Sequence, residues 1–433
     1  MLVLSQSRSL RYSTFFYLYI MQGIPSGFAL TAVTNYLTAE GLDARAIGLF
    51  GATIGLPWGF KFVWGPIVDR FQDSAMGHRR PWILLAQVMA FLASLSILLV
   101  DNPVANLNLL TWAFLLHGVF ASLQDVSVDA MAITVVPAIE RGRVNAFMKG
   151  GLVTGQAIGS AGLAYMIRDA SFHTAALTQS AILFLFTLIT FLIREQPSDS
   201  AWSLRMQPRQ PGSQSYPHSF FQLLRELTKA LTAPRSLLLF AAVAIVLISE
   251  RLFQRVFFFD LIRNLGWTDT SVSGLNGTYG TLAAVSLALV GGWLSDRVGA
   301  QRMLIGAAIG IGLLHISFSL AASAWSNPGM ATGALIVRQT LEPIFSIAAL
   351  PVLMGLCRPG IEGAQFAVYM ALSNQADIVG IYLSGQLLSY SSAPNIGIGC
   401  GLFMLGAGVV MQVFARRPVL TKSFIRTGTS ASN

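Results

Sequence analysis

Charged residues are scarce in this chain, and that scarcity decides its class. Asp, Glu, Lys and Arg make up 11% of the 433 residues, whereas soluble globular domains carry about 25%. Hydrophobic residues reach 54%. A soluble domain cannot bury that much apolar surface, so we expect a membrane protein.

Cysteine is almost absent, with Cys357 and Cys400 as the only two. This excludes a disulfide framework and a Cys-rich metal site. We find no metal-binding spacing of His, Asp and Glu and no nucleotide motif, so we expect no metal, no cofactor and no catalytic residue. These absences argue against a membrane-embedded enzyme. Nothing resembles a cleavable signal peptide, because the first apolar run is of full membrane-spanning length.

Apolar stretches of about 20 residues recur along the chain, each long enough to cross a bilayer as one helix. We expect twelve transmembrane spans, at 13–37, 46–68, 81–100, 108–132, 144–167, 173–193, 236–260, 271–294, 303–322, 329–352, 364–388 and 395–415. The connections are short except for 194–235, which is polar, basic and rich in Pro and Ser, as in a flexible linker. That segment is too short and polar for the output domain of a sensor. The prediction is an all-α membrane protein with a six-helix bundle in 1–193, a cytoplasmic linker in 194–235, a second six-helix bundle in 236–416 and a tail in 417–433.

The net charge of +9 comes from Lys and Arg residues that gather in alternate loops. The other loops hold only Arg45, Arg168 and Arg263. This is the positive-inside pattern, and it places both termini in the cytoplasm. The basic charge therefore sets the topology and implies no nucleic-acid partner.

The two halves share a signature at the end of their second spans. Gly65–Arg70 ends in Asp69-Arg70, and Gly292–Arg297 ends in Asp296-Arg297, each with a basic cluster downstream. A duplicated six-helix unit is the architecture of many secondary transporters, with the substrate site between the halves near mid-membrane. We expect a mechanical, gating role for Asp69, Arg70, Asp296 and Arg297, because an Asp at a helix end can accept backbone N–H bonds and pair with an Arg.

The doubled Gly-x-x-x-Asp-Arg signature resembles that of the major facilitator superfamily. A narrower resemblance, to the AmpG-type muropeptide permeases and the acetyl-CoA transporters grouped with them, rests on Gln22–Gly27, Lys61–Arg70, Arg79–Trp82 and Ala121–Asp125 with Asp129. It implies a major facilitator fold and a proton-driven importer of anhydro-muropeptide in the bacterial inner membrane. Siderophore permeases share these motifs, so a siderophore or another anionic metabolite is the alternative cargo. We expect a monomer.

Charges inside the spans cost roughly 2.5–3.5 kcal/mol each at the membrane centre, so each is a candidate for function. Arg251 and Arg255 share a helix face and suit a carboxylate or phosphate. Alternatively, Glu250 or Asp260 neutralises them, or Arg255 reaches outward. The expected substrate-binding residues are Gln22, Lys61, Gln124, Arg251, Arg255, Arg338 and Asp377.

Buried carboxylates are the candidates for proton coupling, namely Glu250, Glu342 and Asp125. Arg338 lies four residues before Glu342, and an ion pair between them on one helix is the slightly favoured interpretation. Asp125 and Asp129 share a face, where they either couple protons or form a cytoplasmic gate with Lys61 or Lys149; their depth favours the gate. We expect His117 and His315 to be packed residues without a further role.

The fifth span carries Gly151, Gly155, Gly159 and Gly162 at helical spacing. Small residues at this spacing let helix backbones approach closely in lipid. Close packing and a role in sliding helices are equally good interpretations of this stripe.

Overall fold

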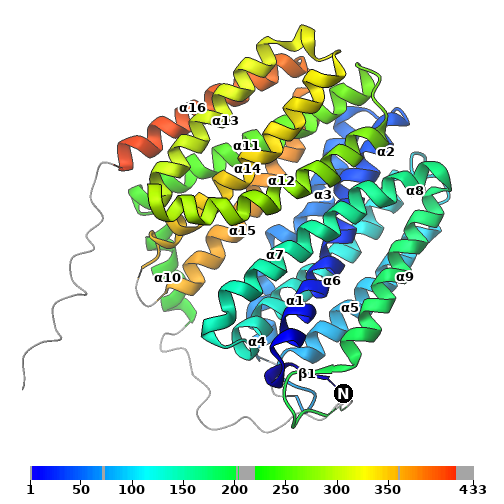
Figure 1. Ribbon diagram of the computed structural model, residues 1–433, viewed down its shortest axis with the longest axis vertical. Helices are drawn as coiled ribbons and strands as arrows, with labels where there is room; N and C mark the ends of the chain where they lie inside the picture. Colours follow the sequence, from blue (N-terminus) through cyan, green and yellow to red (C-terminus); the bar gives the residue numbers. More distant parts are fainter. Residues whose placement is uncertain (1, 71–73, 201–202, 204–219, 359–360, 416–433) are drawn as a thin grey trace, which may run out of the picture.

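The computed structural model describes residues 2–70, 74–200, 203, 220–358 and 361–415. It is almost entirely helical (Figure 1). The main helices are α1 (Arg8–Gly27), α2 (Thr34–Ala39), α3 (Ala44–Gly59), α4 (Trp64–Arg70), α5 (Arg80–Leu95), α6 (Leu107–Val135), α7 (Arg141–Ala157), α8 (Leu163–Asp169), α9 (Phe172–Phe191), α10 (Phe220–Leu231), α11 (Pro234–Arg263), α12 (Asp269–Val298), α13 (Ala300–Leu320), α14 (Pro328–Met354), α15 (Glu362–Leu387) and α16 (Ala393–Ala415). Two π-helical segments continue them, η2 (Phe28–Val33) between α1 and α2 and η6 (Ile158–Gly162) between α7 and α8; the 3-10 helix η3 (Lys61–Val63) links α3 to α4.

Nine helical runs among the described residues are long and apolar enough to cross a membrane. The expected spans at 144–167, 271–294 and 364–388 are helical too, in α7–α8, α12 and α15, but are not among those nine. The total of twelve spans therefore stays a prediction. The expectation that 194–235 is a flexible loop is wrong for 220–231, which form α10.

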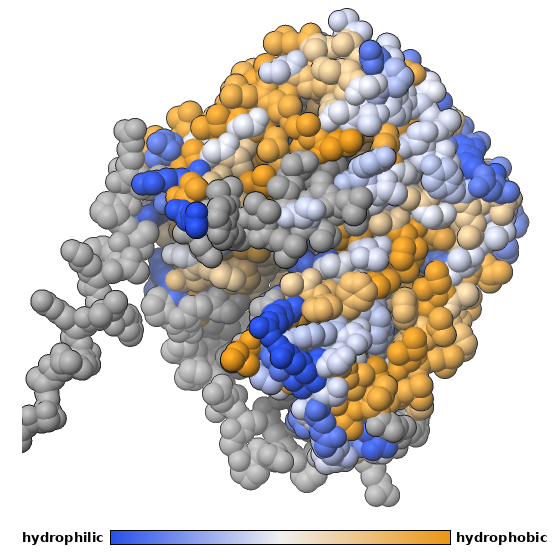
Figure 2. Space-filling model, viewed as in Figure 1, coloured by the Kyte–Doolittle hydropathy of each residue, from blue (hydrophilic) through white to orange (hydrophobic). Residues whose placement is uncertain are grey.

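The space-filling view shows hydrophobic side chains over the flanks of the molecule and hydrophilic ones gathered toward its ends (Figure 2). Many large apolar side chains are exposed, among them Leu85, Leu92, Leu402 and Phe403. A contiguous apolar surface of this kind is favourable only in contact with lipid.

Several sets of packed side chains form the interior, with large ones in both halves of the chain. Phe28, Phe114 and Phe172 belong to a cluster built within residues 24–186. Phe257 belongs to a second cluster that spans residues 252–400, and its ring packs edge-on against Trp325 with centroids 5.0 Å apart. The apolar run Phe257-Phe258 is thus core.

The glycine stripe, which runs from α7 into η6, packs directly on α1. A Cβ at Gly151, Gly155 or Gly159 would collide with a carbonyl oxygen of the α1 backbone, whereas one at Gly162 would meet nothing within 4 Å. The stripe therefore serves close packing, as small residues do where helices meet in lipid. Along α1 itself, Pro25 lacks a backbone donor, and the π-helical segment η2 follows directly after it.

Several helix contacts join the first half of the chain to the second, and two of them are the most extensive. α3 packs along α15, where a Cβ on Gly48 would lie 2.9 Å from the Cα of Gly385. α7 and η6 pack along α12. We call the end of the molecule with α2, α8 and the loop at 264–268 the α2 end, and the end with α4, α10 and strand β1 the α10 end (Figure 1).

A short strand pair closes the α10 end of the first half. β1 (Leu2–Val3) pairs in parallel with β2 (Ile193–Arg194). Next to β2, the carboxylate of Glu195 accepts hydrogen bonds from the backbone N–H groups of Arg79 and Arg80, at 2.7 and 2.6 Å. The connection between α4 and α5 is thereby fixed to the end of α9.

Candidate functional site

Ion pairs and buried polar groups gather on α11, α13, α14 and α15, near the middle of the second half. On α11, Arg251 contacts Asp377 of α15, with Nη2 3.3 Å from Oδ2. Its Nη1 donates to Gln254 at 2.8 Å. Asp377 therefore neutralises Arg251. The sequence had suggested Glu250 or Asp260 for this role, and that interpretation is wrong.

Glu250 lies one residue before Arg251 and points to a different pair of helices. One carboxylate oxygen lies 2.5 Å from Nη1 of Arg338 on α14, and the other lies 3.1 Å from Nε2 of His315 on α13. All three side chains are buried. Two interpretations from the sequence are corrected: Arg338 pairs across helices with Glu250 instead of with Glu342, and His315 is a member of a charged cluster instead of an isolated packed residue.

Glu342 lies one turn along α14 from Arg338 and is half-buried. Among the described residues it has neither an ion pair nor a hydrogen bond. It is thus a carboxylate inside a span without the compensation that Glu250 has.

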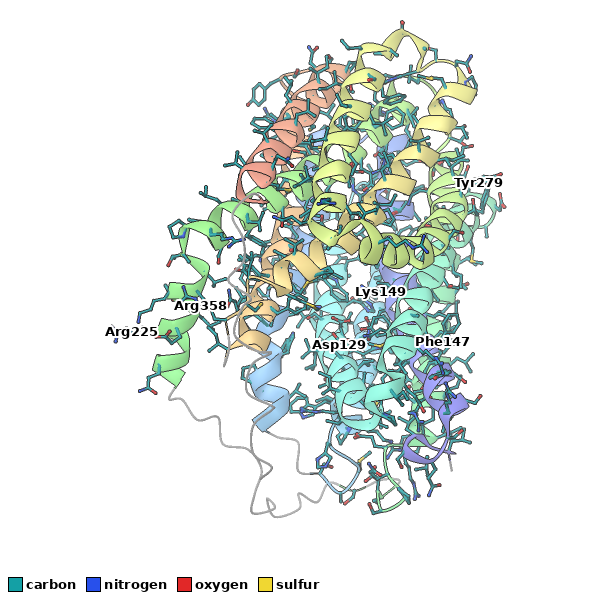
Figure 3. The ribbon with its side chains drawn as sticks, turned by 60° about the vertical axis from the view of Figure 1, so that its left-hand side comes forward. Asp129, Phe147, Lys149, Arg225, Tyr279 and Arg358 are labelled. Carbon is teal, nitrogen blue, oxygen red and sulfur yellow. The ribbon has the colours of Figure 1, made fainter. Side chains whose placement is uncertain are left out.

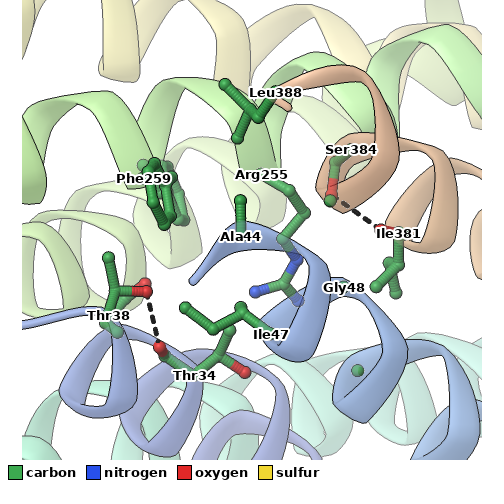
Figure 4. Close-up of a pocket in the computed structure, with 14 residues that line it drawn as sticks. Thr34, Thr38, Ala44, Ile47, Gly48, Arg255, Phe259, Ile381, Ser384 and Leu388 are labelled. Carbon is green, nitrogen blue, oxygen red and sulfur yellow. Dashed lines mark hydrogen bonds between the residues drawn. The ribbon is translucent and has the colours of Figure 1, made fainter. Parts of the chain in front are cut away.

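Arg255 lies one turn beyond Arg251 on α11 and points into a pocket between the two halves (Figure 4). The pocket has an empty volume of about 400 Å³, including its opening, and is lined by α2, α3, α11 and α15. The guanidinium reaches toward Ile47 and Gly48 of α3 and donates to the carbonyl of Leu30 in η2. Within the described part of the chain it has no carboxylate partner, and its Nε is buried without a hydrogen bond.

The polar lining of this pocket consists of side chains that already donate their protons. Thr34 and Thr38 donate to backbone carbonyls of their own helical run, at 3.0 and 2.8 Å, and Ser384 donates to that of Ile381 at 2.7 Å. Their hydroxyl oxygens can still accept hydrogen bonds. Asn35, which also lines the pocket, donates from Nδ2 to Ser273 at 2.9 Å and keeps a second N–H donor. Arg255 supplies the charged donors of the pocket.

A second polar cluster lies in the first half, toward the α10 end. Lys61 Nζ lies 2.8 Å from Oδ2 of Asp125, and the hydroxyl of Tyr19 donates to Asp129. Lys61 thus pairs with an Asp, which was one of the two roles weighed for it. Lys149 on α7 lies in the same region as Asp129 (Figure 3) and is exposed.

Two expected glutamines are buried beside that cluster. Gln124 of α6 is close to Leu18 of α1, with its Nε2 3.5 Å from the Leu18 carbonyl oxygen, and Gln22 lies on α1. The Nε2 of Gln22 has no hydrogen-bond partner among the described residues.

Of the four expected gating residues, the structure describes the side chain of one, Arg297. The side chains of Asp69, Arg70 and Asp296 lie outside those that the structure describes. Arg297, in the last turn of α12, is exposed. Their predicted role stays a prediction.

Two participants were missed by sequence reasoning, His315 and Tyr19. His315 lies inside a span, and an ionisable side chain there indicates function by itself, so this signal was available. Tyr19 gave no such signal, since tyrosine is frequent in membrane helices.

Comparison with known proteins identifies the fold family. Residues 13–381 match the model of the Major Facilitator Superfamily. The chain belongs to this superfamily. It is a multi-pass membrane protein and a secondary transporter of small molecules.

Two curated relatives cover most of the chain. It is 25% identical over 352 residues to the Anhydromuropeptide permease of Escherichia coli strain K12, which covers 81% of this chain and 69% of that protein. It is 24% identical over 386 residues to Putative transporter AmpG 4 of Rickettsia conorii, covering 86% of this chain and 89% of that one. The resemblance drawn from the first-half motifs is thereby confirmed.

Solved structures show the same fold at low identity. The nucleoside transporter NupG superposes with a TM-score of 0.70 at 13% identity, covering 94% of this chain and 100% of that one. The D-xylose-proton symporter gives 0.67 at 13% identity, covering 93% and 97%. The major facilitator fold is therefore confirmed.

Proposed function

We propose that this transporter imports an anionic cell-wall fragment of the anhydro-muropeptide type, together with protons, across the bacterial inner membrane. The similarity to the Anhydromuropeptide permease over 81% of the chain supports the substrate class. The proposal includes a monomer with both termini in the cytoplasm. The positive-inside pattern supports the location of the termini.

The observation that carries the proposal is the unpaired guanidinium of Arg255. Arg251 is neutralised by Asp377, so an incoming anion gains little from it. Arg255 has buried donors without a carboxylate partner among the described residues and points into a pocket between the halves. The planar guanidinium fork suits a carboxylate, and a peptide stem supplies such groups.

The pocket lies toward the α2 end, which the positive-inside pattern predicts to be periplasmic. There α3 and α15 approach closely at Gly48 and Gly385, and their contact closes the pocket in this conformation. Separation of these helices would open Arg255 to the periplasm. Once this end opens, Arg255 can bind the carboxylate of an incoming substrate.

The test is uptake of tritiated anhydro-muropeptide by cells that lack their own permease and express this chain. Uptake should collapse when a protonophore is added. The Arg255→Gln variant should lose uptake while it remains in the membrane, and Arg255→Lys, which keeps the charge but not the fork, should retain part of it.

Arg45→Gln is the matched control. Arg45 is an arginine at the same end, with hydrogen bonds to Ser389 and Tyr390 at 2.9 Å, but it lies outside the pocket. Normal uptake by Arg255→Gln would disprove the assigned site. Absence of uptake by the parent protein, present in the membrane, would reject the substrate.

A further inference from the structure

Glu250 is held from two sides by groups of different chemistry. The Arg338 Nη1 atom lies 2.5 Å from one of its oxygens, and the His315 Nε2 atom lies 3.1 Å from the other. The three side chains are 6%, 5% and 1% exposed. Buried charges of this kind persist only where they are paired. A change in the charge of one partner must therefore be compensated by a change in the pairing of the other two.

His315 faces few other charged or titratable groups. Phe253 of α11 covers its ring, with centroids 4.7 Å apart. α11 brings Glu250 toward it, α14 brings Arg338 with Glu342 one turn away, and α16 brings the thiol of Cys400, which belongs to the same region of core. The described ionisable residues of α12 are Asp269 and Arg297 near its ends and Tyr279, whose side chain is exposed.

The cluster has unused hydrogen-bonding capacity. Nδ1 of His315 and both Nε and Nη2 of Arg338 are buried without a partner among the described residues. Nε2 of His315 and the Glu250 oxygen 3.1 Å away also lack a hydrogen bond, so this contact is an ion-pair distance only. When Nε2 carries the hydrogen, Nδ1 has a free lone pair, and the imidazole can accept one more proton there while Nε2 stays beside Glu250.

A proton on His315 changes the charge balance of the cluster. With neutral imidazole, Glu250 and Arg338 cancel. Glu342 then has no ion pair of its own, and the neighbouring cation, Arg251, is already paired with Asp377. With imidazolium, His315 and Glu250 cancel, and Arg338 is free to pair with Glu342. Since these two residues are four apart on α14, they share a helix face, and the second arrangement needs only a side-chain movement.

We propose that His315 takes up the transported proton on Nδ1, and that Arg338 then passes from Glu250 to Glu342. The step forms one N–H bond at Nδ1 with a proton from the aqueous phase and breaks no covalent bond of the protein. It couples protonation to a change in the contact between α11 and α14. This inference rests on the proton coupling of the proposed function.

The first experiment compares two modes of transport in proteoliposomes, using tritiated anhydro-muropeptide. His315→Gln keeps an N–H donor for Glu250 but cannot take up a proton. Its uptake driven by a pH gradient should fall by roughly tenfold or more. Counterflow, which needs binding and conformational change but no net proton movement, should be retained and should lose its pH dependence.

His117→Gln is the control, because His117 is the other buried histidine of a described span and contacts only a backbone carbonyl, that of Ala90, at 2.9 Å. It should leave gradient-driven uptake and the pH profile unchanged. Gradient-driven uptake at the parental rate in His315→Gln would overturn the proposal. A parent protein that ignores the pH gradient would reject the proposed coupling itself.

A second measurement needs no substrate. Carbon NMR of protein labelled at histidine Cε1, in lipid nanodiscs, should contain one signal that His315→Gln removes. Between pH 5 and 8, the position of that signal should change with pH in the parent. A His315 signal that does not titrate in the parent would overturn the proposal, whichever substrate is carried.

Discussion

Arg168 Nε lies 3.0 Å from Oδ2 of Asp269, and this ion pair joins the end of α8 to the first residue of α12. The same guanidinium holds Glu40 through Nη1 at 2.7 Å. Asp269 is 4% exposed, and its carboxylate lies at a helix N-terminus, where negative charge is favoured. The two halves are thus tied together at the α2 end, and opening this end requires the Arg168–Asp269 pair to break.

Removal of this tie should favour opening. In Arg168→Gln, a cysteine placed at buried Thr38, with Cys357 and Cys400 replaced, should react faster with a maleimide that cannot cross membranes. A cost of one or two kcal/mol corresponds to a factor of roughly 5–30 in population, and the rate should rise accordingly. Glu40→Gln should have a smaller effect, because that pair is exposed. Equal labelling in all three proteins would show that the pair does not hold the α2 end closed.

The glycine stripe predicts a steric effect with an internal control. In Gly155→Ala, the new Cβ meets the carbonyl oxygen and carbon of Ile20, which are backbone atoms and cannot rotate away. Overpacking of this kind costs about 1–3 kcal/mol, so the melting temperature in detergent should fall. Gly162→Ala, with nothing within 4 Å of its Cβ, should melt like the parent. If both variants melt alike, the close approach of α1 and α7 is not needed for stability.

Glu195 predicts a pH dependence of stability outside the membrane. Burial raises the pKa of its carboxyl group, although hydrogen bonds from the backbone N–H groups of Arg80 and Arg79 oppose the shift. A carboxyl group whose pKa is higher in the folded state favours folding at acid pH, and this contribution is lost as the pH rises through the folded-state pKa. Glu195→Gln keeps an acceptor for both N–H groups without the charge. Its melting temperature relative to the parent should therefore be higher at pH 7.5 than at pH 4.5. If the melting temperatures of variant and parent differ by the same amount at pH 7.5 and at pH 4.5, the predicted pKa shift of Glu195 is contradicted.

The sequence predicted the architecture well because lipid imposes strong rules. Spans are about 20 residues long and apolar, and basic loops mark one side. Helix α10 was missed because its apolar residues alternate with charged ones in a polar linker, and only its helical periodicity distinguishes it.

The partners of the intramembrane charges could not be predicted in the same way. Arg338 had a suitable carboxylate four residues away in Glu342, yet it pairs with Glu250, 88 positions away in sequence. Local spacing states which groups share a face, but the packing of α11, α13 and α14 decides which faces meet. Arg251 and Arg255 likewise share a face, and only the structure shows that Asp377 reaches one of them and not the other.

The pairing of β1 with β2 also has a consequence for biosynthesis. Leu2 leaves the ribosome early, but its partner Ile193 follows about 190 residues later, roughly 10–40 s at bacterial elongation rates. During that interval the first residues have no partner strand, and the first half cannot complete its fold at the α10 end. Purification handles placed before Leu2 would remain at this unfinished edge throughout insertion, so a handle after residue 415 interferes least with assembly.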